Sequence, residues 1–269
     1  MSNIVGYGRV EIRVGDCREL LRAMPAESVD CVVTDPPYQQ TSLEWDRWPD
    51  GWPTEVRRVL KPTGSMWVFG SLRMFMERRD DFGGWRMAQD IVWEKHNGSS
   101  FHADRFRRVH EQAVQFYRDD APWGEVYKAK VVTLDATKRT VRRKQRPPHM
   151  GQIERGHYTS EDGGPRLMRS VIAVRSMHGA AVHPTQKPLA LIERLIEIFT
   201  DPDDVVIDPC AGSGVTLLGA KNLWRRAYGF EIKKNFFRDA NERILTYSSP
   251  YLFCEKAPRR EDAQAELIV

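Results

Sequence analysis

Short apolar runs that end in an acidic residue recur along this chain and constrain its fold more than any other feature. One run covers residues 29–35 (VDCVVTD), a second opens the stretch 205–214 (VVIDPCAGSG), and a third covers 227–232 (AYGFEI). Near-continuous apolar runs of this length are typical of strands that are buried on both faces of a parallel sheet. Predicted helices lie between them, so we expect an α/β fold with a doubly wound, mostly parallel sheet.

The other predicted elements continue this alternation up to about residue 120. Strands are predicted over 9–16, 65–70, 87–95 and 111–119, and helices over 17–25, 54–61 and 189–199. Residues from about 120 to 180 are rich in Gly, Pro and charge, and no element is predicted there. Ligands of open α/β sheets bind beyond the carboxyl ends of the strands. The acids that end the predicted strands therefore mark the expected site.

The cysteines argue against a metal centre. Cys17, Cys31, Cys210 and Cys254 are scattered and have no metal-ligand spacing. We therefore expect free thiols in a reducing cytoplasm and no bound metal. No apolar run reaches the roughly 18 residues that a membrane span needs, and the N-terminus lacks the features of a signal peptide.

Positive charge is concentrated in one segment. Residues 120–180 carry 12 Lys and Arg against 6 Asp and Glu, although the whole chain has a net charge of only +4. The densest part is 138–146 (KRTVRRKQR). A solvated loop and a surface that contacts phosphates are both consistent with this pattern.

The glycine turn at 208–221 (DPCAGSGVTLLGAK) restricts the choice of ligand. A nicotinamide-binding turn needs a third glycine where this chain has Leu217, and a phosphate-binding loop needs Lys where it has Ala220. What remains is a tight turn that lets backbone approach a ligand, with an acid, Glu231, at the end of the next strand. This favours a nucleoside without phosphates, such as S-adenosylmethionine; an ordinary strand-to-helix turn is the alternative.

The two motifs DPPY (35–38) and DPCAGSG (208–214) resemble those of the DNA amino methyltransferases, which make N6-methyladenine or N4-methylcytosine. In the β-class of that family the catalytic half precedes a target-recognition region and the cofactor half. The resemblance covers about residues 8–247 and implies a Rossmann-like sheet with this cyclically permuted motif order. It divides the chain into a catalytic half (1–119), a basic, partly flexible target-recognition region (120–180), a cofactor-binding half (181–249) and a C-terminal tail (250–269).

The resemblance implies S-adenosylmethionine as the cofactor, with S-adenosylhomocysteine as its product. Asp16 would accept a hydrogen bond from the cofactor's adenine, and Glu231 would bind its ribose. Lys187 would bind the methionine carboxylate beside a helix N-terminus. Family members usually carry Phe where this chain has Cys210, which would loosen packing over the cofactor. The implied cofactor-binding residues are Asp16, Cys17, Asp35, His183, Thr185, Lys187, Asp208, Cys210, Gly212, Gly214 and Glu231.

The catalytic residues implied by the resemblance are Asp35, Pro36, Pro37 and Tyr38. An exocyclic amine is a poor nucleophile, and the Asp35 carboxylate and the Pro36 carbonyl can accept its two N–H bonds. The prolines would hold these acceptors in place, and Tyr38 would stack on a base flipped out of double-stranded DNA. Transfer would be direct, without a covalent enzyme intermediate.

DNA is the expected partner, and a homodimer in the bacterial or phage-infected cytoplasm is the expected form. The candidate DNA-contacting residues are Lys138, Arg139, Arg142, Arg143, Lys144 and Arg146. N6 of adenine is the predicted target because the family usually pairs D-P-P-Y with adenine and S-P-P-Y with cytosine. The alternatives are N4 of cytosine, an inactive DNA-binding relative, and methylation of RNA or protein glutamine, for which N-P-P-Y would be expected.

Overall fold

The computed structural model describes residues 4–7, 9–99, 103–104, 106–143, 156–175 and 186–246. The chain divides into two compact units. The larger comprises Met1–Ala129 and Val171–Val269, and the smaller is the segment Lys130–Ser170.

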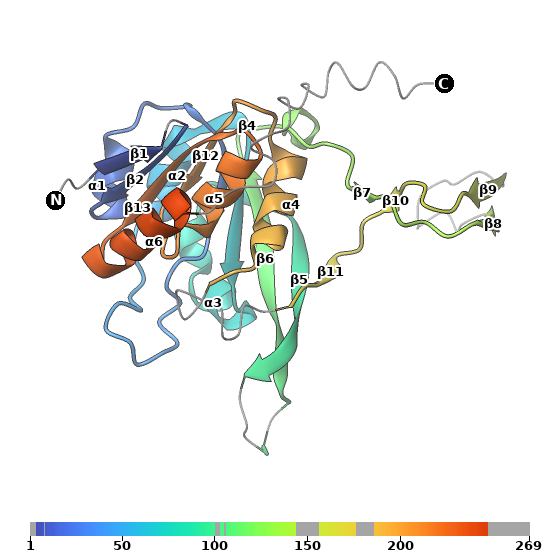
Figure 1. Cartoon of the computed structure of the whole chain (residues 1–269), viewed down its shortest axis with the longest axis horizontal. Coiled ribbons are helices and arrows are strands. Elements are labelled where there is room, and N and C mark those ends of the chain that lie inside the picture. The colour runs from blue at the N-terminus through green and yellow to red at the C-terminus, as the bar shows by residue number, and fades with distance from the viewer. Residues whose placement is uncertain are drawn as a thin grey trace. The chain divides into compact units, whose positions relative to one another are not determined.

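Nine strands in the described residues of the larger unit form one mixed sheet (Figure 1). The five strands from β2 to β4 run parallel, whereas β1 and β6 are antiparallel to their neighbours. This confirms the predicted doubly wound, mostly parallel α/β sheet. From one edge to the other the strands are β1 (Ile4–Tyr7), β2 (Val10–Val14), β13 (Arg226–Glu231), β12 (Val205–Asp208), β3 (Val29–Thr34), β4 (Leu60–Gly70), β6 (Arg108–Arg118), β5 (Trp85–Ser99) and β11 (Val171–Ala173).

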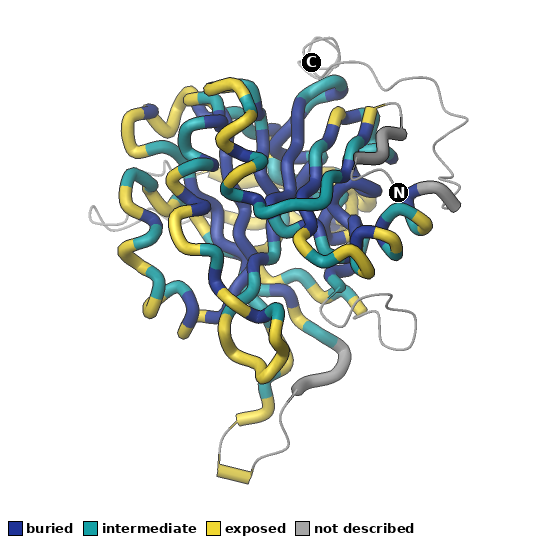
Figure 2. Tube along the Cα trace, turned by 90° about the vertical axis from the view of Figure 1, so that its left-hand side faces the viewer, coloured by how far each residue is buried: buried dark blue, intermediate teal, exposed yellow. Residues whose placement is uncertain are grey.

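Helices cover both faces of this sheet. On one face α4 (Leu189–Phe199) packs on β3 and β4, α5 (Val215–Asn222) on β12 and β13, and α6 (Lys234–Thr246) on β1 and β2 (Figure 1). The other face carries α1 (Cys17–Arg22), α2 (Trp52–Val59) and α3 (Leu72–Glu77), whose apolar side chains share one core with the strands. Short 3-10 turns occupy Arg79–Phe82 (η1) and Trp123–Glu125 (η2). The central strands are buried along most of their length (Figure 2).

None of the helices in the described ranges is long and apolar enough to cross a membrane.

The start of β4 differs from the prediction. The sequence predicted a helix as far as residue 61 and a turn over 61–64, but α2 ends at Val59 and β4 begins at Leu60. Leu60 is fully buried and pairs with Val29, after which the register shifts before Cys31 pairs with Ser65. Burial of the Leu60 side chain thus draws the chain into the sheet early, and the predicted turn becomes an irregular part of the strand.

The segment Lys130–Ser170 contains two small strand pairs, so the prediction of no regular element from 120 to 180 is wrong for this part. β7 (Val132–Thr133) pairs with β10 (Arg166–Leu167), and β8 (Arg139–Arg143) pairs with β9 (Gly156–Ser160). The β8–β9 pair has almost no buried side chains, which is why apolar alternation does not mark it. Its backbone pairing is supplemented by Asp162, whose carboxylate accepts a hydrogen bond from the Lys138 amide at 2.6 Å.

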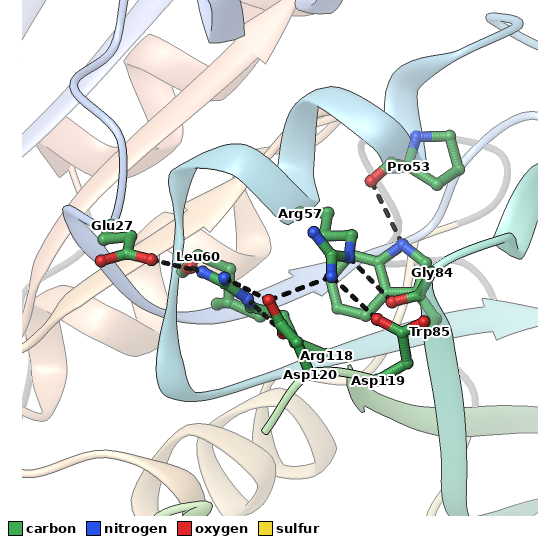
Figure 3. A network of polar contacts seen from close by, with 9 residues as sticks. All are labelled: Glu27, Pro53, Arg57, Leu60, Gly84, Trp85, Arg118, Asp119 and Asp120. Carbon is green, nitrogen blue, oxygen red and sulfur yellow. Dashed lines mark hydrogen bonds and ion pairs between the residues drawn. The ribbon is translucent and has the colours of Figure 1, made fainter.

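A network of charged residues ties together the starts of β3, β4 and β5 (Figure 3). Arg118, at the end of β6, donates two hydrogen bonds to Asp120 at 2.7 and 2.9 Å and others to Glu27 and the Leu60 carbonyl. Arg57 donates to Asp119 at 2.8 Å and to the Gly84 carbonyl at 2.9 Å. We call Glu27, Arg57, Arg118, Asp119 and Asp120 the edge network. It lies at the edge of the sheet opposite to the carboxyl ends of the parallel strands.

Candidate active site

Acidic side chains from four parallel strands converge at one edge of the sheet. Because β2, β3, β12 and β13 are parallel, their carboxyl ends meet there. The Thr34 hydroxyl on β3 donates a 2.8 Å hydrogen bond to the Asp208 carboxylate on β12, across 174 residues of sequence. The two halves of the chain therefore meet at this edge. The acids at or just after the strand ends are Asp16, Asp35, Asp208 and Glu231.

Two adjoining pockets open at the same edge. The first, of about 650 Å³, lies between Asp35 and the turn at 210–213. The second, of about 1050 Å³, extends from Cys210 past Glu231 to Asp16. Because they share lining residues, they form one trough across the strand ends. The shared residues are Pro37, Trp45, Cys210, Glu231 and Lys233.

The glycine turn between β12 and α5 needs its glycines. Gly212 and Gly214 have φ angles of 47° and 71°, in the left-handed region that favours glycine. A Cβ on Gly214 would lie 3.0 Å from the Cβ of Ala240 on α6. The Gly212 amide donates a 2.9 Å hydrogen bond to Glu231 at the end of β13. The turn is therefore held in place by the neighbouring strand and exposes backbone to the first pocket.

Asp208 and Glu231 are both buried and both organise this turn. Asp208 accepts hydrogen bonds from Thr34 and, at 3.1 Å, from the Cys210 amide, and burial raises its pKa to about 6. Glu231 accepts from the amides of Gly212 and Lys233. Burial also raises the pKa of Glu231, against the effect of these amides. Each carboxylate thus has a structural role in addition to the cofactor role predicted for it.

Asp16, Cys17 and Cys210 line the second pocket. Asp16 caps α1 by accepting from the Arg18 amide at 2.9 Å, and its ion pair with the Arg18 side chain lowers the pKa of Asp16. A hydrogen bond with the Cys17 side chain and burial raise the pKa of Cys210 well above its ordinary value. The Cys210 thiol therefore stays protonated at neutral pH and fills the position where the family usually has Phe.

The DPPY corner follows β3 directly and borders the first pocket. Pro36 is buried and Pro37 is half-buried, which fixes the backbone after Asp35. The Tyr38 hydroxyl donates a hydrogen bond to Asp35 Oδ1, and the Tyr38 ring packs against the core. Burial raises the pKa of Tyr38, so its hydroxyl is a proton donor. Stacking of Tyr38 on a base remains a prediction.

The comparison with protein families agrees with this geometry. The family model described as DNA methylase, for the N6 and N4 amino methyltransferases, matches residues 29–242 of this chain. The chain belongs to this family. Type II methyltransferase M.HinfI of Haemophilus influenzae is 29% identical to this chain over an alignment of 263 positions that covers 86% of this chain and 67% of that protein. Residues 29–242, which the family model matches, include both the DPPY corner and the glycine turn.

Solved structures of other DNA methylases share the fold. The M1.HpyAVI–SAM complex has a TM-score of 0.60 and 26% identity, covering 88% of this chain and all of that chain. PvuII DNA methyltransferase, described as cytosine-N4-specific, has a TM-score of 0.60 and 18% identity, covering 96% of this chain and 91% of its own. At that identity the PvuII enzyme shows a common fold, and the target base of this methylase is not decided by it.

Four charged side chains of this methylase meet at the first residue of the DPPY corner. They are Asp35, Lys95, Glu111 and Lys187, and we call them the site quartet. Lys187, just before α4, is 4% exposed and places its Nζ 2.5 Å from Asp35 Oδ2 and 3.1 Å from Glu111 Oε2. Lys95, on β5, donates to Glu111 Oε1. The Lys187 ammonium also lies 5.4 Å from the centre of the Phe69 ring. Lys187 lines the first pocket, and two carboxylates of the protein bind its ammonium, so its predicted contact with the methionine carboxylate stays a prediction.

Burial and charge oppose each other in the site quartet. Burial and the charge of Glu111 raise the pKa of Asp35, against the attraction of Lys187. Burial alone would raise the pKa of Glu111, but Lys187 and Lys95 outweigh it and bring it to about 2. Burial alone would lower the pKa of Lys187, but Asp35 and Glu111 raise it. Glu111 and Lys187 are therefore charged at neutral pH.

Glu111, like Lys95, is a site residue to which the sequence analysis assigned no role. It occupies β6, within the predicted strand 111–119, and its carboxylate is buried in the site quartet. One signal in the sequence could have revealed it. Glu111 is an acidic residue in a strand whose next residues, Ala113, Val114 and Phe116, are apolar and buried.

Some predicted residues do not enter this description. His183, Thr185, Lys144 and Arg146 lie outside the described residues, as does the side chain of Arg143. Lys138, Arg139 and Arg142 are exposed in or beside β8 of the smaller unit, where Lys138 forms an ion pair with Glu161 at 3.1 Å. Their DNA-binding role stays a prediction. Within the described ranges no group of three or more His, Cys, Asp and Glu could hold a metal ion.

Proposed function

We propose that this chain transfers the methyl group of S-adenosylmethionine to the N6 amino group of an adenine flipped out of double-stranded DNA. The observation that carries the proposal is the position of the Asp35–Tyr38 corner. It borders the same pocket as the glycine turn that follows β12. An acceptor for the target amine and a cradle for the methyl donor therefore lie side by side.

The residues of the trough fit S-adenosylmethionine, which supplies an electrophilic methyl group on a positively charged sulfur. Gly212, which has no Cβ, lines the first pocket together with Ala211 and Ser213 of the same turn. Three carboxylates, those of Asp35, Asp208 and Glu231, line that pocket against two ammonium groups, those of Lys187 and Lys233, and this acidic balance suits a cation. The adenosine end would extend into the second pocket, toward Asp16.

Asp35 is the proposed acceptor for the target amine. As a carboxylate it would accept one N–H of the amine, and the Pro36 carbonyl would accept the other. Both acceptors sit on a backbone fixed by two consecutive prolines, so their positions are set before the base arrives. Held in this way, the nitrogen can direct its lone pair at the methyl group, and positioning supplies most of the acceleration.

Adenine is the proposed base because the corner begins with Asp35, and the family usually couples D-P-P-Y to adenine. The N4 amine of cytosine presents the same two N–H donors, so the product must be identified directly. Residues 120–180 would recognise the DNA, with Lys138, Arg139 and Arg142 among those that contact phosphates. In this proposal residues 1–119 form the catalytic half, residues 181–249 the cofactor-binding half and residues 250–269 a tail. The protein would act as a homodimer in the bacterial or phage-infected cytoplasm.

Mass spectrometry of the nucleosides released from treated DNA tests this function. The protein is incubated with S-adenosylmethionine and unmethylated DNA of broad sequence coverage, beside an Asp35→Asn variant that keeps the shape of the side chain. We expect N6-methyladenine from the wild type and a rate at least roughly 100-fold lower from the variant, as when one preorganised transition-state partner is removed. N4-methylcytosine would replace the base assignment, and no methylated base at all would refute the proposal.

A further inference from the structure

We propose that Glu111 is a positioning residue that draws the Lys187 ammonium away from Asp35 when the target amine binds. The inference rests on the proposed function, in which Asp35 accepts an N–H of that amine. It assigns a role to a strand residue that lies outside the DPPY corner and the glycine turn.

Asp35 is occupied by donors of the protein itself. Tyr38 donates to Oδ1, and Lys187 lies 2.5 Å from Oδ2. Both Asp35 and Lys187 line the first pocket, so the ammonium stands where an amine entering from that pocket would approach Oδ2. An ammonium at this distance competes for the oxygen and makes Asp35 a weaker acceptor. Asp35 can therefore bind the target amine well only if Lys187 gives way.

Glu111 offers Lys187 a second position. Its Oε1 atom accepts a hydrogen bond from Lys95, which holds the carboxylate in place. Its Oε2 atom is buried and lies 3.1 Å from Lys187 Nζ, as against 2.5 Å between that nitrogen and Asp35 Oδ2. The ammonium therefore already contacts Glu111, but less closely than Asp35, and a small movement toward Oε2 would strengthen the contact with Glu111 at the expense of that with Asp35.

The charges of the site quartet favour such a transfer. Two carboxylates and two ammonium groups have no net charge together, and Lys187 stays between the same two carboxylates throughout. No charge has to enter or leave the buried site. The other titratable groups that influence Asp35 and Tyr38 are Asp208 on β12 and Arg108 on β6. They do not contact Lys187 through any described ion pair.

The pH profile of kcat in single and double variants tests the inference. Glu111→Gln removes the competing carboxylate, so Asp35 is the one carboxylate of the quartet that still binds Lys187. We expect kcat to fall roughly tenfold. The acid limb of its pH profile should move about one pH unit lower, because loss of the Glu111 charge lowers the pKa of Asp35. Affinity for S-adenosylmethionine, measured by calorimetry, should stay within about twofold. In a Lys187→Gln background the same substitution should change neither kcat nor the pH profile.

Two further variants keep the test decisive. Lys95→Gln leaves Glu111 with Lys187 as its one partner in the quartet, so the acid limb should move to higher pH, opposite to the effect of Glu111→Gln. Glu94→Gln makes the same chemical change as Glu111→Gln at an exposed position of β5 and should leave kcat and its pH profile unchanged.

A Glu111→Gln enzyme with the wild-type kcat and acid limb would overturn the inference, and an inactive Asp35→Asn enzyme beside it would leave the proposed function intact. Equal losses by Glu111→Gln in the wild-type and Lys187→Gln backgrounds would also overturn it. If the wild type methylates no base, the proposed function fails and the inference fails with it.

Discussion

Strand β6 carries a charged cluster near each end, and the two clusters differ in how they are solvated. The site quartet includes Glu111 near the start of β6, and the edge network includes Arg118 at its end. Lys187 in the quartet is 4% exposed, whereas the side chain of Asp120 in the edge network is 46% exposed. Ion pairs in both clusters have similar lengths, so distance alone does not distinguish them.

The comparison shows that two carboxylates can have similarly lowered pKa values for different physical reasons. The pKa of Asp120 is lowered to about 2 by a hydrogen bond from Arg118, with little burial to oppose it. The pKa of Glu111 also lies at about 2, but there two ammonium groups overcome a large effect of burial. Loss of Lys187 from the quartet leaves two poorly solvated carboxylates with a single cation, whereas loss of Arg118 from the edge network leaves carboxylates that water can solvate.

The largest expected effect is that of Lys187→Met. It leaves Asp35 and Glu111 in the site quartet with Lys95 as their one cation, and we expect the free energy of unfolding to fall by about 3–5 kcal/mol. Denaturant unfolding measures this. Lys61→Met is the matched control, because Lys61 forms a 2.6 Å ion pair with Asp30 and its side chain is 39% exposed. It should cost less than about 1 kcal/mol. Similar losses in the two variants would show that burial of the ammonium does not set the cost of losing it.

A smaller effect is expected from Arg118→Met in the edge network. Asp120 and Glu27 remain half-exposed or more, so water replaces the guanidinium, and the loss of unfolding free energy should be about 1 kcal/mol. Methyl transfer should be unchanged, since the edge network lies at the other edge of the sheet. A loss of activity without a loss of stability would show that β6 transmits changes from one edge to the other.

The smallest expected effect is that of salt on the pKa values of Asp120 and Glu111. Each carboxylate with a lowered pKa stabilises the fold above its ordinary pKa, and that contribution is lost as the pH falls through about 2. At 1 M salt the screening length is about 3 Å, so the pKa of Asp120 should rise toward its ordinary 3.8. The pKa of buried Glu111 should stay near 2. Carboxyl titration followed by NMR at low and high salt measures both, and equal shifts would contradict the difference in burial.

The sequence contained enough information for the parallel sheet and for the residues of its two motifs. Apolar runs that end in Asp35, Asp208 and Glu231 locate the site edge because parallel strands align their carboxyl ends. α6 was not predicted, although Phe237, Ala240 and Ile244 recur at helical spacing and are buried. The charged residues between them obscured that pattern.

The site quartet could not have been predicted in the same way. Glu111 lies opposite Trp93 in the antiparallel β5–β6 pair, which brings Lys95, two residues further along β5, within reach of it, and Lys187 joins them from a segment more than 70 residues later. Sequence spacing carries no signal for such a meeting. The roles of Asp208 and Glu231 in pinning the glycine turn likewise depend on which strands become neighbours.

The meeting of β3 and β12 has a consequence for how such a chain can be assembled. The two halves join through lateral pairing and the Thr34–Asp208 hydrogen bond, not through residues adjacent in sequence. α6, the last described helix, packs against β1 and β2, the first strands. A circular permutant opened between residues 143 and 156, with the ends of α6 and β1 linked, would keep every strand neighbour of the central sheet. Two separate fragments could complement each other for the same reason.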